Sequence, residues 1–334
     1  MLNLRVFLLG QPIVVVLAVL LVYFSIYADG FADATNITNV LRQTSMLGIV
    51  VVGMSIVILT GGIDLSVGSV VALSTVLVAG LATDYPPIVG INVALIAGAA
   101  IGFLNGSLIA VFGLQPIIVT ISTMTIVRGL AMWLSESRPI FGTLPDDFFL
   151  LFNSRVLGLP LPVVIFCFIS IVAVFCLSNT RLGRTFYQVG GNEEAASLAG
   201  ISVRSSKIIA YTICGFLSSI AGIILTARMQ SGDGVRTGMG WELDAIAAAA
   251  VGGISLLGGR GHLFGALCGV LIIGLLANAF NLMGINPYWQ RIVVGLVLAV
   301  AVICYNQKFK QWLLRIQKAV STRSKRSGSP TPAV

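Results

Sequence analysis

The chain has 334 residues, of which 57% are hydrophobic and only 10% are charged, and its mean hydropathy is +1.00. These values exclude an ordinary soluble domain and predict an all-α, polytopic membrane protein. The net charge is +8, and seven of the twenty basic residues follow the last apolar run. This placement indicates an orientation signal and attraction to anionic lipid, not a nucleic-acid site.

Ten apolar runs of about the length of a bilayer crossing follow one another along the chain. The first could be a signal peptide, but it is long for one and has no small-residue cleavage site, so we expect a retained helix. The third run follows a glycine-rich break, and the eighth is also short and is the least defined of the ten crossings. The runs are expected at about 12–28, 44–60, 69–82, 88–112, 117–134, 161–177, 208–227, 243–257, 263–283 and 288–305.

Charge predicts the topology of these ten crossings. An even number of crossings places both chain ends and the polar stretch 179–207 on one side, and all three carry excess Lys and Arg. The positive-inside rule makes that side cytoplasmic. The loops 29–43 and 135–160 are then expected outside.

An internal repeat is visible in the joints between crossings. Gly113-Leu114-Gln115-Pro116 and Gly284-Ile285-Asn286-Pro287 lie 171 residues apart, and Gly98 and Gly269 share this offset. The predicted topology places the two joints on opposite sides of the membrane. Such inverted repeats are typical of transporters with alternating access. The alternative is that the matches are two ordinary loops that start helices with proline.

The break Gly61–Ser69 places a carboxylate at membrane depth. Two glycines end the second run, and either Asp64 or Ser66 can cap the next helix. An ionisable group at this depth is a candidate functional group, although Asp64 could simply satisfy backbone donors. Trp241-Glu242-Leu243-Asp244 precedes the eighth run in a similar way and could also be structural.

The central polar stretch contains one short helix with clear ends. Asn192 can accept a hydrogen bond in the first turn, two acidic residues favour the positive helix end, and Gly200 permits a left-handed stop. The helix is smooth and lies between basic flanks, which favours docking on a partner; a surface connector is the alternative. Its residues are Asn192, Glu193, Glu194, Ala195, Ala196, Ser197, Leu198 and Gly200.

Four stretches resemble a known family: GGIDLSVGS at 61–69, GLQPIIVTISTMTIVRGLA at 113–131, LGRTFYQVGGNEEAASLAGISVRSSK at 182–207 and ELDAIAAAAVGGISLLGGRG at 242–261. Together they look like the permease subunit of bacterial ribose-type ABC sugar importers, from residue 14 to residue 301. The resemblance implies a second permease, identical or paralogous, an ATP-binding subunit on the cytoplasmic face, and an external sugar-binding protein. It also implies that residues 192–200 are similar to the coupling helix, with the role of each glutamate open.

The sequence offers no nucleotide site of its own. It contains no G-x-x-x-x-G-K-[ST] loop, and Gly258-Gly259-Arg260-Gly261 lacks the lysine and hydroxyl that such a loop needs. The five cysteines have no paired spacing, so no metal site is expected. We therefore expect no enzyme activity and no cofactor on this chain, with ATP and Mg on the partner ATPase. A secondary transporter driven by an ion gradient is the competing interpretation.

A sugar path requires neutral hydrogen-bonding side chains. The candidates on this path are Asp64, Asn105, Gln115, Asn278 and Asn281. Asn278 and Asn281 share a helix face, but membrane asparagines also bond neighbouring helices. Arg128 must find a partner or extend to the surface, and the external protein is expected to contact Arg138, Arg155 and Arg236.

The sequence as a whole predicts a ten-helix permease domain over residues 1–320. The Ser- and Pro-rich basic tail 321–334 is expected to be disordered and cytoplasmic. The expected location is the bacterial inner membrane, with both termini in the cytoplasm.

Overall fold

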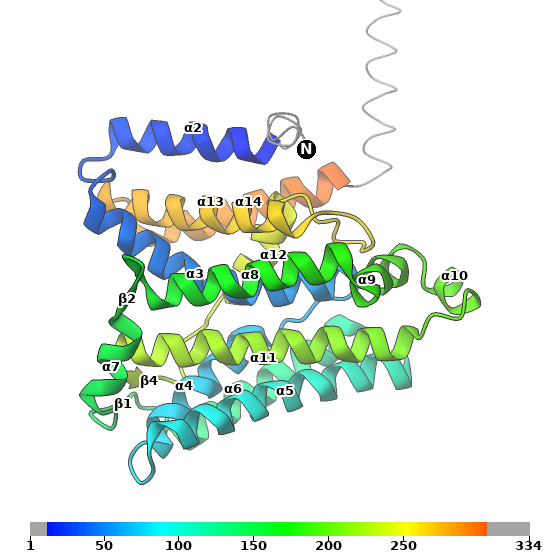
Figure 1. Cartoon of the computed structure of the whole chain (residues 1–334), viewed down its shortest axis with the longest axis horizontal. Helices are drawn as coiled ribbons and strands as arrows, with labels where there is room; N and C mark the ends of the chain where they lie inside the picture. The colour runs from blue at the N-terminus through cyan, green and yellow to red at the C-terminus, as the bar shows by residue number, and fades with distance from the viewer. Residues whose placement is uncertain (1–11, 306–334) are drawn as a thin grey trace, which may run out of the picture.

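A computed structural model describes residues 12–305 of the chain, and nearly all of its regular structure is helical (Figure 1). The short strands form two antiparallel pairs, β1 with β4 and β2 with β3. The elements are α2 (Pro12–Tyr27), α3 (Ala34–Leu59), α4 (Val67–Leu81), α5 (Pro87–Phe112), α6 (Pro116–Leu134), β1 (Ile140–Phe141), α7 (Asp146–Asn153), β2 (Arg155–Val156), β3 (Leu159–Pro160), α8 (Leu161–Asn179), α9 (Arg181–Gly191), α10 (Glu193–Leu198), α11 (Val203–Met229), β4 (Ser231–Gly232), α12 (Trp241–Val251), α13 (Leu263–Leu282) and α14 (Pro287–Tyr305).

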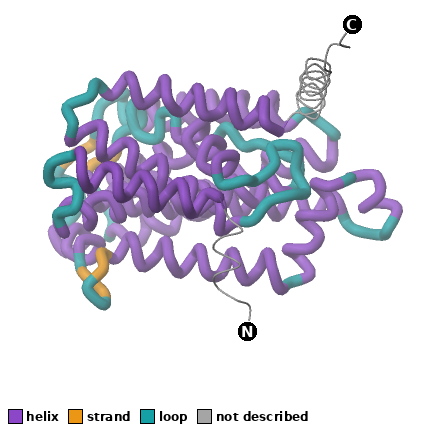
Figure 2. The backbone as a smooth tube through the Cα atoms, turned by 90° about the horizontal axis from the view of Figure 1, so that it is seen from above, coloured by secondary structure: helices purple, strands orange, loops and turns teal. Residues whose placement is uncertain are grey.

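The long helices lie side by side along one axis of the molecule. Figures 1 and 2 show the strands and α7 at one end of this bundle, while α9 and α10 project at the other end. We call these the α7 end and the α10 end. The polar insertions of the sequence therefore gather at the two ends of an apolar bundle.

Every expected apolar run is a helix in the structure, but three boundaries need correction. The seventh run begins at Val203 instead of residue 208. The second run begins at Ala34 instead of residue 44, because polar side chains of its first turns are held by hydrogen bonds. Asn36, for example, donates to the carbonyl oxygen of Phe31 and to the side chain of Asn278. Residues 34–43 are therefore helix, not loop. The eighth run ends at Val251 instead of residue 257, where Gly252 and Gly253 follow.

Six of the described helices, α3, α5, α6, α8, α11 and α13, are long and apolar enough to cross a membrane. Two others are much shorter than the hydrocarbon core of a bilayer, which is about 30 Å thick. The 15 residues of α4 and the 11 residues of α12 span about 22 Å and 16 Å at 1.5 Å per residue. Non-helical segments, 60–66 before α4 and 233–240 before α12, extend these two short helices.

The expected inverted repeat is present in the fold. In Figure 1, α3 to α6 run in the opposite directions to α11 to α14, taken in the same order. The joint between α5 and α6 lies at the α10 end, and the joint between α13 and α14 lies at the α7 end (Figure 1). The short helices α4 and α12 occupy equivalent places in the two halves, which is where transporters of this design place their sites.

The core forms where α11 packs against α3, α4 and α5. Glycine makes the approach of α5 to α11 possible, because a Cβ at Gly98 would overlap Ser219 Oγ and the carbonyl oxygen of Gly215. A Cβ at Gly215 would in turn overlap the carbonyl oxygen of Gly98. Small residues at helix contacts are typical of membrane bundles, whose stability depends on close packing.

We predict that Gly98→Val destabilises the protein by separating α5 from α11. Overpacking costs about 1–3 kcal/mol at a comparable contact, so the thermal midpoint in detergent should fall. Gly129→Ala on α6 is the matched control, because a Cβ there would meet no atom within 4 Å. An unchanged midpoint for Gly98→Val, measured by tryptophan fluorescence, would contradict the tight contact.

Candidate functional site

Helix α10 is a short helix that the sequence predicts correctly in its local geometry. The Asn192 side chain caps it by accepting a hydrogen bond from the backbone N–H of Ala195 at 2.9 Å, and Gly200 follows with φ +79°. Of residues 192–200 only Ala196 is buried, and Leu198 is 85% exposed. An apolar side chain held out on a rigid, capped helix is suited to a partner's groove.

The two glutamates of α10 differ in their surroundings. Glu193 forms an ion pair with Lys207 at the start of α11, with 2.6 Å between Oε2 and Nζ. Glu194 is exposed and has no hydrogen bond or ion pair with any described residue. The Glu193 pair ties α10 to α11, while the Glu194 carboxylate has no partner among the described residues.

Helix α9 joins α10 to the interior of the bundle. Thr180 caps it by accepting from Gly183 N at 3.2 Å, and Phe186 and Val189 bury its apolar side. Tyr187 donates from its hydroxyl to the carbonyl oxygen of Gly261 at 3.0 Å. Partial burial raises the pKa of Tyr187, which keeps the phenol protonated and able to donate.

The far end of α9 contacts both broken regions at once. A Cβ at Gly190 would overlap the carbonyl oxygen of Leu59, the last residue of α3, and would also meet the backbone of Gly259. The backbone N–H of Gly259, in the loop after α12, donates to the same Leu59 oxygen at 3.1 Å. Helix α9 is therefore in direct contact with the end of α3 and with the loop that follows α12.

Asp64 closes the break between α3 and α4. Its Oδ1 accepts from the N–H of Ser66 at 2.9 Å and from the Ser66 hydroxyl at 2.6 Å. Asn105 on α5 donates to Ser66 Oγ at 3.0 Å and accepts from Thr123 of α6 at 2.7 Å. The chain of hydrogen bonds thus ties the break to two neighbouring helices, and both Asp64 and Asn105 are buried.

The other residues predicted for a solute path lie elsewhere. Asn278 on α13 exchanges two hydrogen bonds, at 2.9 Å and 2.8 Å, with Asn36 on α3. Gln115 and Asn281 are exposed and lie near opposite ends of the bundle, beside the two joints (Figure 1). The five predicted residues therefore do not line one common cavity, and only Asp64 and Asn105 belong to the same cluster.

Arg128 holds the second break. Its guanidinium Nη1 donates to the carbonyl oxygens of Gly234 and Thr237, at 3.1 Å and 2.7 Å. Gly238 lies in the segment that Arg128 holds, and a Cβ at Gly238 would overlap the backbone of Gly68 at the start of α4. The beginnings of the two short helices therefore meet inside the bundle, and Arg128 has the structural partner that its sequence position requires.

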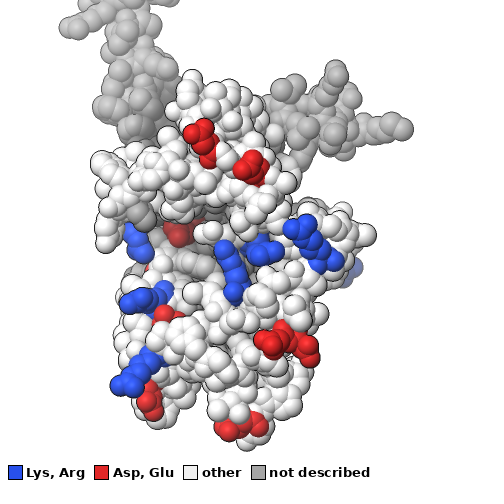
Figure 3. Space-filling view, turned by 90° about the vertical axis from the view of Figure 1, so that its left-hand side faces the viewer, with Lys and Arg blue, Asp and Glu red and all other residues white. Residues whose placement is uncertain are grey.

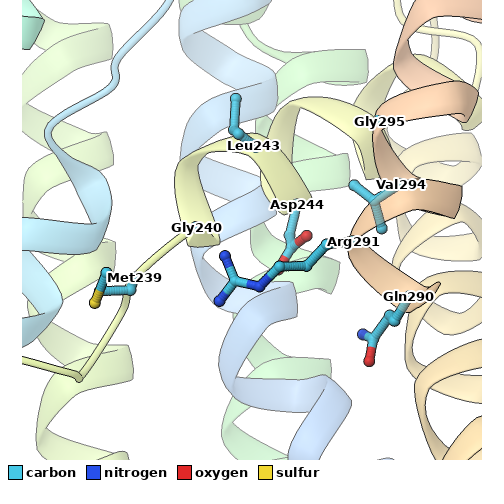
Figure 4. A pocket seen from close by; sticks show the side chains of 8 residues that line it. All are labelled: Met239, Gly240, Leu243, Asp244, Gln290, Arg291, Val294 and Gly295. Carbon is cyan, nitrogen blue, oxygen red and sulfur yellow. The ribbon is translucent and has the colours of Figure 1, made fainter. Parts of the chain in front are cut away.

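A cavity lies between α12 and α14 beside this meeting point. Its volume is about 420 Å³, and its lining includes Leu243, Asp244, Gln290, Arg291 and Val294. Figure 4 shows the side chains of Asp244 and Arg291 reaching into the same space from α12 and α14. The sequence analysis left the role of Asp244 open between a functional and a structural one, and it did not single out Gln290 or Arg291. The sequence feature that could have identified these residues is the presence of polar side chains early in the eighth and tenth apolar runs.

The three arginines predicted to meet an external protein are exposed and belong to segments at the α7 end. Arg138 precedes β1, Arg155 begins β2 and Arg236 follows β4. Figure 3 views this end and shows basic and acidic side chains spread over it without one dominant sign. The structure brings the three residues to one end of the bundle but shows no concentrated basic patch there, and their contact with an external protein stays a prediction.

Comparison with known proteins places this architecture in a family. The family model described as branched-chain amino acid transport system / permease component matches residues 36–302. The ribose import permease protein RbsC of Haemophilus influenzae is 42% identical over 304 residues, which cover 90% of this chain and 94% of that protein. The L-arabinose transport system permease protein AraH of Escherichia coli is 39% identical, covering 89% and 91%. The D-allose transport system permease protein AlsC of the same organism is 34% identical, covering 86% and 88%. No solved structure matches the chain.

We predict that Asn105→Leu lowers stability. The substitution removes both the amide that donates to Ser66 and the oxygen that accepts from Thr123, inside the protein. Leaving buried polar groups without partners costs about 1–3 kcal/mol each. Asn281→Leu is the control, since this exposed side chain has no hydrogen bond within the described residues. Equal midpoints for the two variants in thermal unfolding would show that the network does not hold the break.

Proposed function

The chain belongs to the family of branched-chain amino acid transport system / permease components, and from this membership we propose that it is the permease subunit of an ATP-driven importer of a small neutral sugar. The proposal rests on one structural observation above the others. The exposed helix α10 is connected through α9 to the backbone beside both breaks. This is the arrangement that an energy-supplying partner on the outside of the bundle requires.

The proposed substrate class is a pentose or hexose. The relatives named for ribose, arabinose and allose transport align along nearly the whole chain, so the similarity is not confined to one motif. A neutral sugar needs hydroxyl-binding side chains and no fixed counter-charge. The particular sugar would depend on a few side chains, because related permeases share one framework and differ in their named sugars.

The ATPase is proposed to bind α10. Leu198 would enter an apolar groove of that partner, and the unpaired Glu194 would meet a basic residue at its rim. The loop Gly258–Gly261 is not a nucleotide site in this proposal, because its glycines are already packed against Gly61, Gly190 and Gly191. ATP and Mg would therefore be held by the partner, whose closure moves α10.

The remaining parts of the importer are proposed from the same architecture. A sugar-binding protein would dock at the α7 end through Arg138, Arg155 and Arg236, and a second permease copy or paralogue would complete the pathway. The chain would lie in the bacterial inner membrane with residues 179–207 and both termini in the cytoplasm. One permease domain over residues 1–320 and a disordered tail are part of this proposal; residues 306–334 lie outside the described part of the chain.

A secondary transporter driven by an ion gradient is the second candidate. The observation in its favour is Asp64, which is buried and whose Oδ2 has no hydrogen-bond partner. Buried carboxylates of this kind bind protons or cations in such transporters. Against this role, Oδ1 is occupied by two bonds to Ser66 that close the break.

We predict that Glu194→Arg abolishes both sugar uptake and co-purification of the ATPase, since it reverses the only unpaired charge of α10. The measurement is uptake of radiolabelled D-ribose, L-arabinose and D-allose by cells, together with a pull-down of the ATPase and quantification of the permease in membranes. Asp84→Arg reverses an exposed charge at the α7 end and should leave co-purification unchanged.

The same assay separates the two candidate functions. If uptake survives Glu194→Arg and stops when the proton or sodium gradient is dissipated, the chain is a secondary transporter and α10 is a connector. If uptake stops while the ATPase still co-purifies, α10 does not carry the ATPase contact.

A further inference from the structure

We propose that the cavity between α12 and α14 is a sugar-binding site on the transport pathway, in which Asp244, Gln290 and Arg291 bind the sugar hydroxyls. This inference rests on the proposed function and adds the residues that would contact the substrate inside the permease. We call this cavity the α12–α14 cavity.

The size and lining of the α12–α14 cavity suit a monosaccharide. Its volume of about 420 Å³ falls in the range of roughly 300–1,000 Å³ that small-molecule sites occupy. Leu243 and Val294 supply apolar surface for the C–H groups of a sugar ring. Asp244 accepts hydrogen bonds, Arg291 donates them, and Gln290 can do both, which together match hydroxyls that donate and accept.

The three polar groups are not bound to other protein groups, apart from the attraction between the charges of Arg291 and Asp244 beside the cavity. None of their side chains forms a hydrogen bond there, and the only ion pair within 4.0 Å in the described residues is that of Glu193 with Lys207. Asp244 and Gln290 are nevertheless partly buried. A partly buried polar group without a protein partner is stabilised only by water or by a ligand, so the cavity must be filled by one of them.

The helix dipole does not explain Arg291. A Cβ at Gly240, immediately before α12, would lie 3.5 Å from Arg291 Nη1, so the guanidinium lies beside the N-terminal end of α12. That end carries partial positive charge and favours anions, not cations. Asp244 in the first turn suits the dipole. The Arg291 guanidinium, which lies beside the same end of α12, does not stabilise that end.

The inverted repeat supplies an internal comparison. At the offset of 171 residues, Asp244 corresponds to Leu73, Gln290 to Val119 and Arg291 to Thr120. All three counterparts are buried and uncharged, in the half whose short helix is α4. The fold therefore builds one copy of this joint without charges, and the charges of the other copy are not needed to form it.

Membrane depth adds a further constraint. Arg291 is exposed, and it lies in the second turn of an apolar helix whose neighbours Ile292 and Leu296 are also exposed. A charged side chain facing hydrocarbon is costly, and such residues face a water-filled cavity or a protein interior instead. Arg291 lies near the start of α14 and lines the α12–α14 cavity, so its guanidinium can be hydrated there instead of facing hydrocarbon.

The test compares Asp244→Asn, Arg291→Gln and the control Glu242→Gln in proteoliposomes that contain the complete importer with its binding protein. Glu242 shares the first turn of α12, but its carboxylate lies against Gly68 at the start of α4 instead of in this cavity. The readout is the amount of radiolabelled D-ribose, L-arabinose or D-allose taken up per ATP hydrolysed. Loss of a hydrogen bond to a charged group weakens binding by roughly ten- to a hundredfold.

We expect Asp244→Asn and Arg291→Gln to keep ATP hydrolysis stimulated by the loaded binding protein while uptake per ATP falls at least about tenfold. Glu242→Gln should keep the wild-type ratio. The proposal is overturned if uptake and hydrolysis fall in parallel in all three variants, as a purely structural role predicts, or if the ratio stays at the wild-type value. If the wild-type complex hydrolyses ATP but carries none of the three sugars, or does not use ATP, the proposed function itself fails.

Discussion

The structure depends on one constraint, which is that backbone inside a membrane must be hydrogen-bonded or buried in protein. The two non-helical segments, 60–66 and 233–240, meet this constraint by matching means. An aspartate turns each segment by accepting from the N–H two residues later, Asp64 from Ser66 and Asp233 from Val235. Neighbouring helices then supply the remaining partners, through Tyr211 to the carbonyl oxygen of Ile63 and through Arg128 to the second segment. A close glycine contact, between Gly68 and Gly238, also joins the two regions.

The same segments explain how a movement of α10 could reach the interior of the bundle. Regular helices transmit displacement as rigid bodies, whereas a break absorbs it as a change in backbone angles. Helix α9 contacts the residue at which α3 ends and the loop that α12 enters, so it acts next to the flexible points and not in the middle of a helix. Thr180 caps the first turn of α9, and Asn192 caps the first turn of α10. A movement of these helices is therefore passed on instead of unwinding their ends.

Much of this fold could be predicted from the sequence, because apolar runs in a membrane are bounded by strong signals. The proline joints at 113–116 and 284–287 and the capped helix at 193–198 lie where the residues indicate. The start of α3 at Ala34 was missed because its polar first turns are stabilised by Asn278, 242 residues away, and not by local pattern. The clustering of Asp64 with Asn105, and the separation of both from Asn278, depend on helix packing that residue type alone cannot show.

The asymmetry between the halves connects the fold to its use. A strictly symmetrical inverted repeat would present the same side chains to both sides of the membrane, and it would have no reason to favour uptake over release. Here the half that contains α4 closes its break with the buried side chains of Asp64, Ser66 and Asn105, while the half that contains α12 places Asp244 and Arg291 beside a cavity. Side chains of the protein therefore close one break, whereas the other break lies beside polar side chains that are open to water or to the proposed sugar. The two halves thus share their order of helices and differ in the side chains at their breaks, and in the proposed function only the half with α12 offers polar groups to a solute.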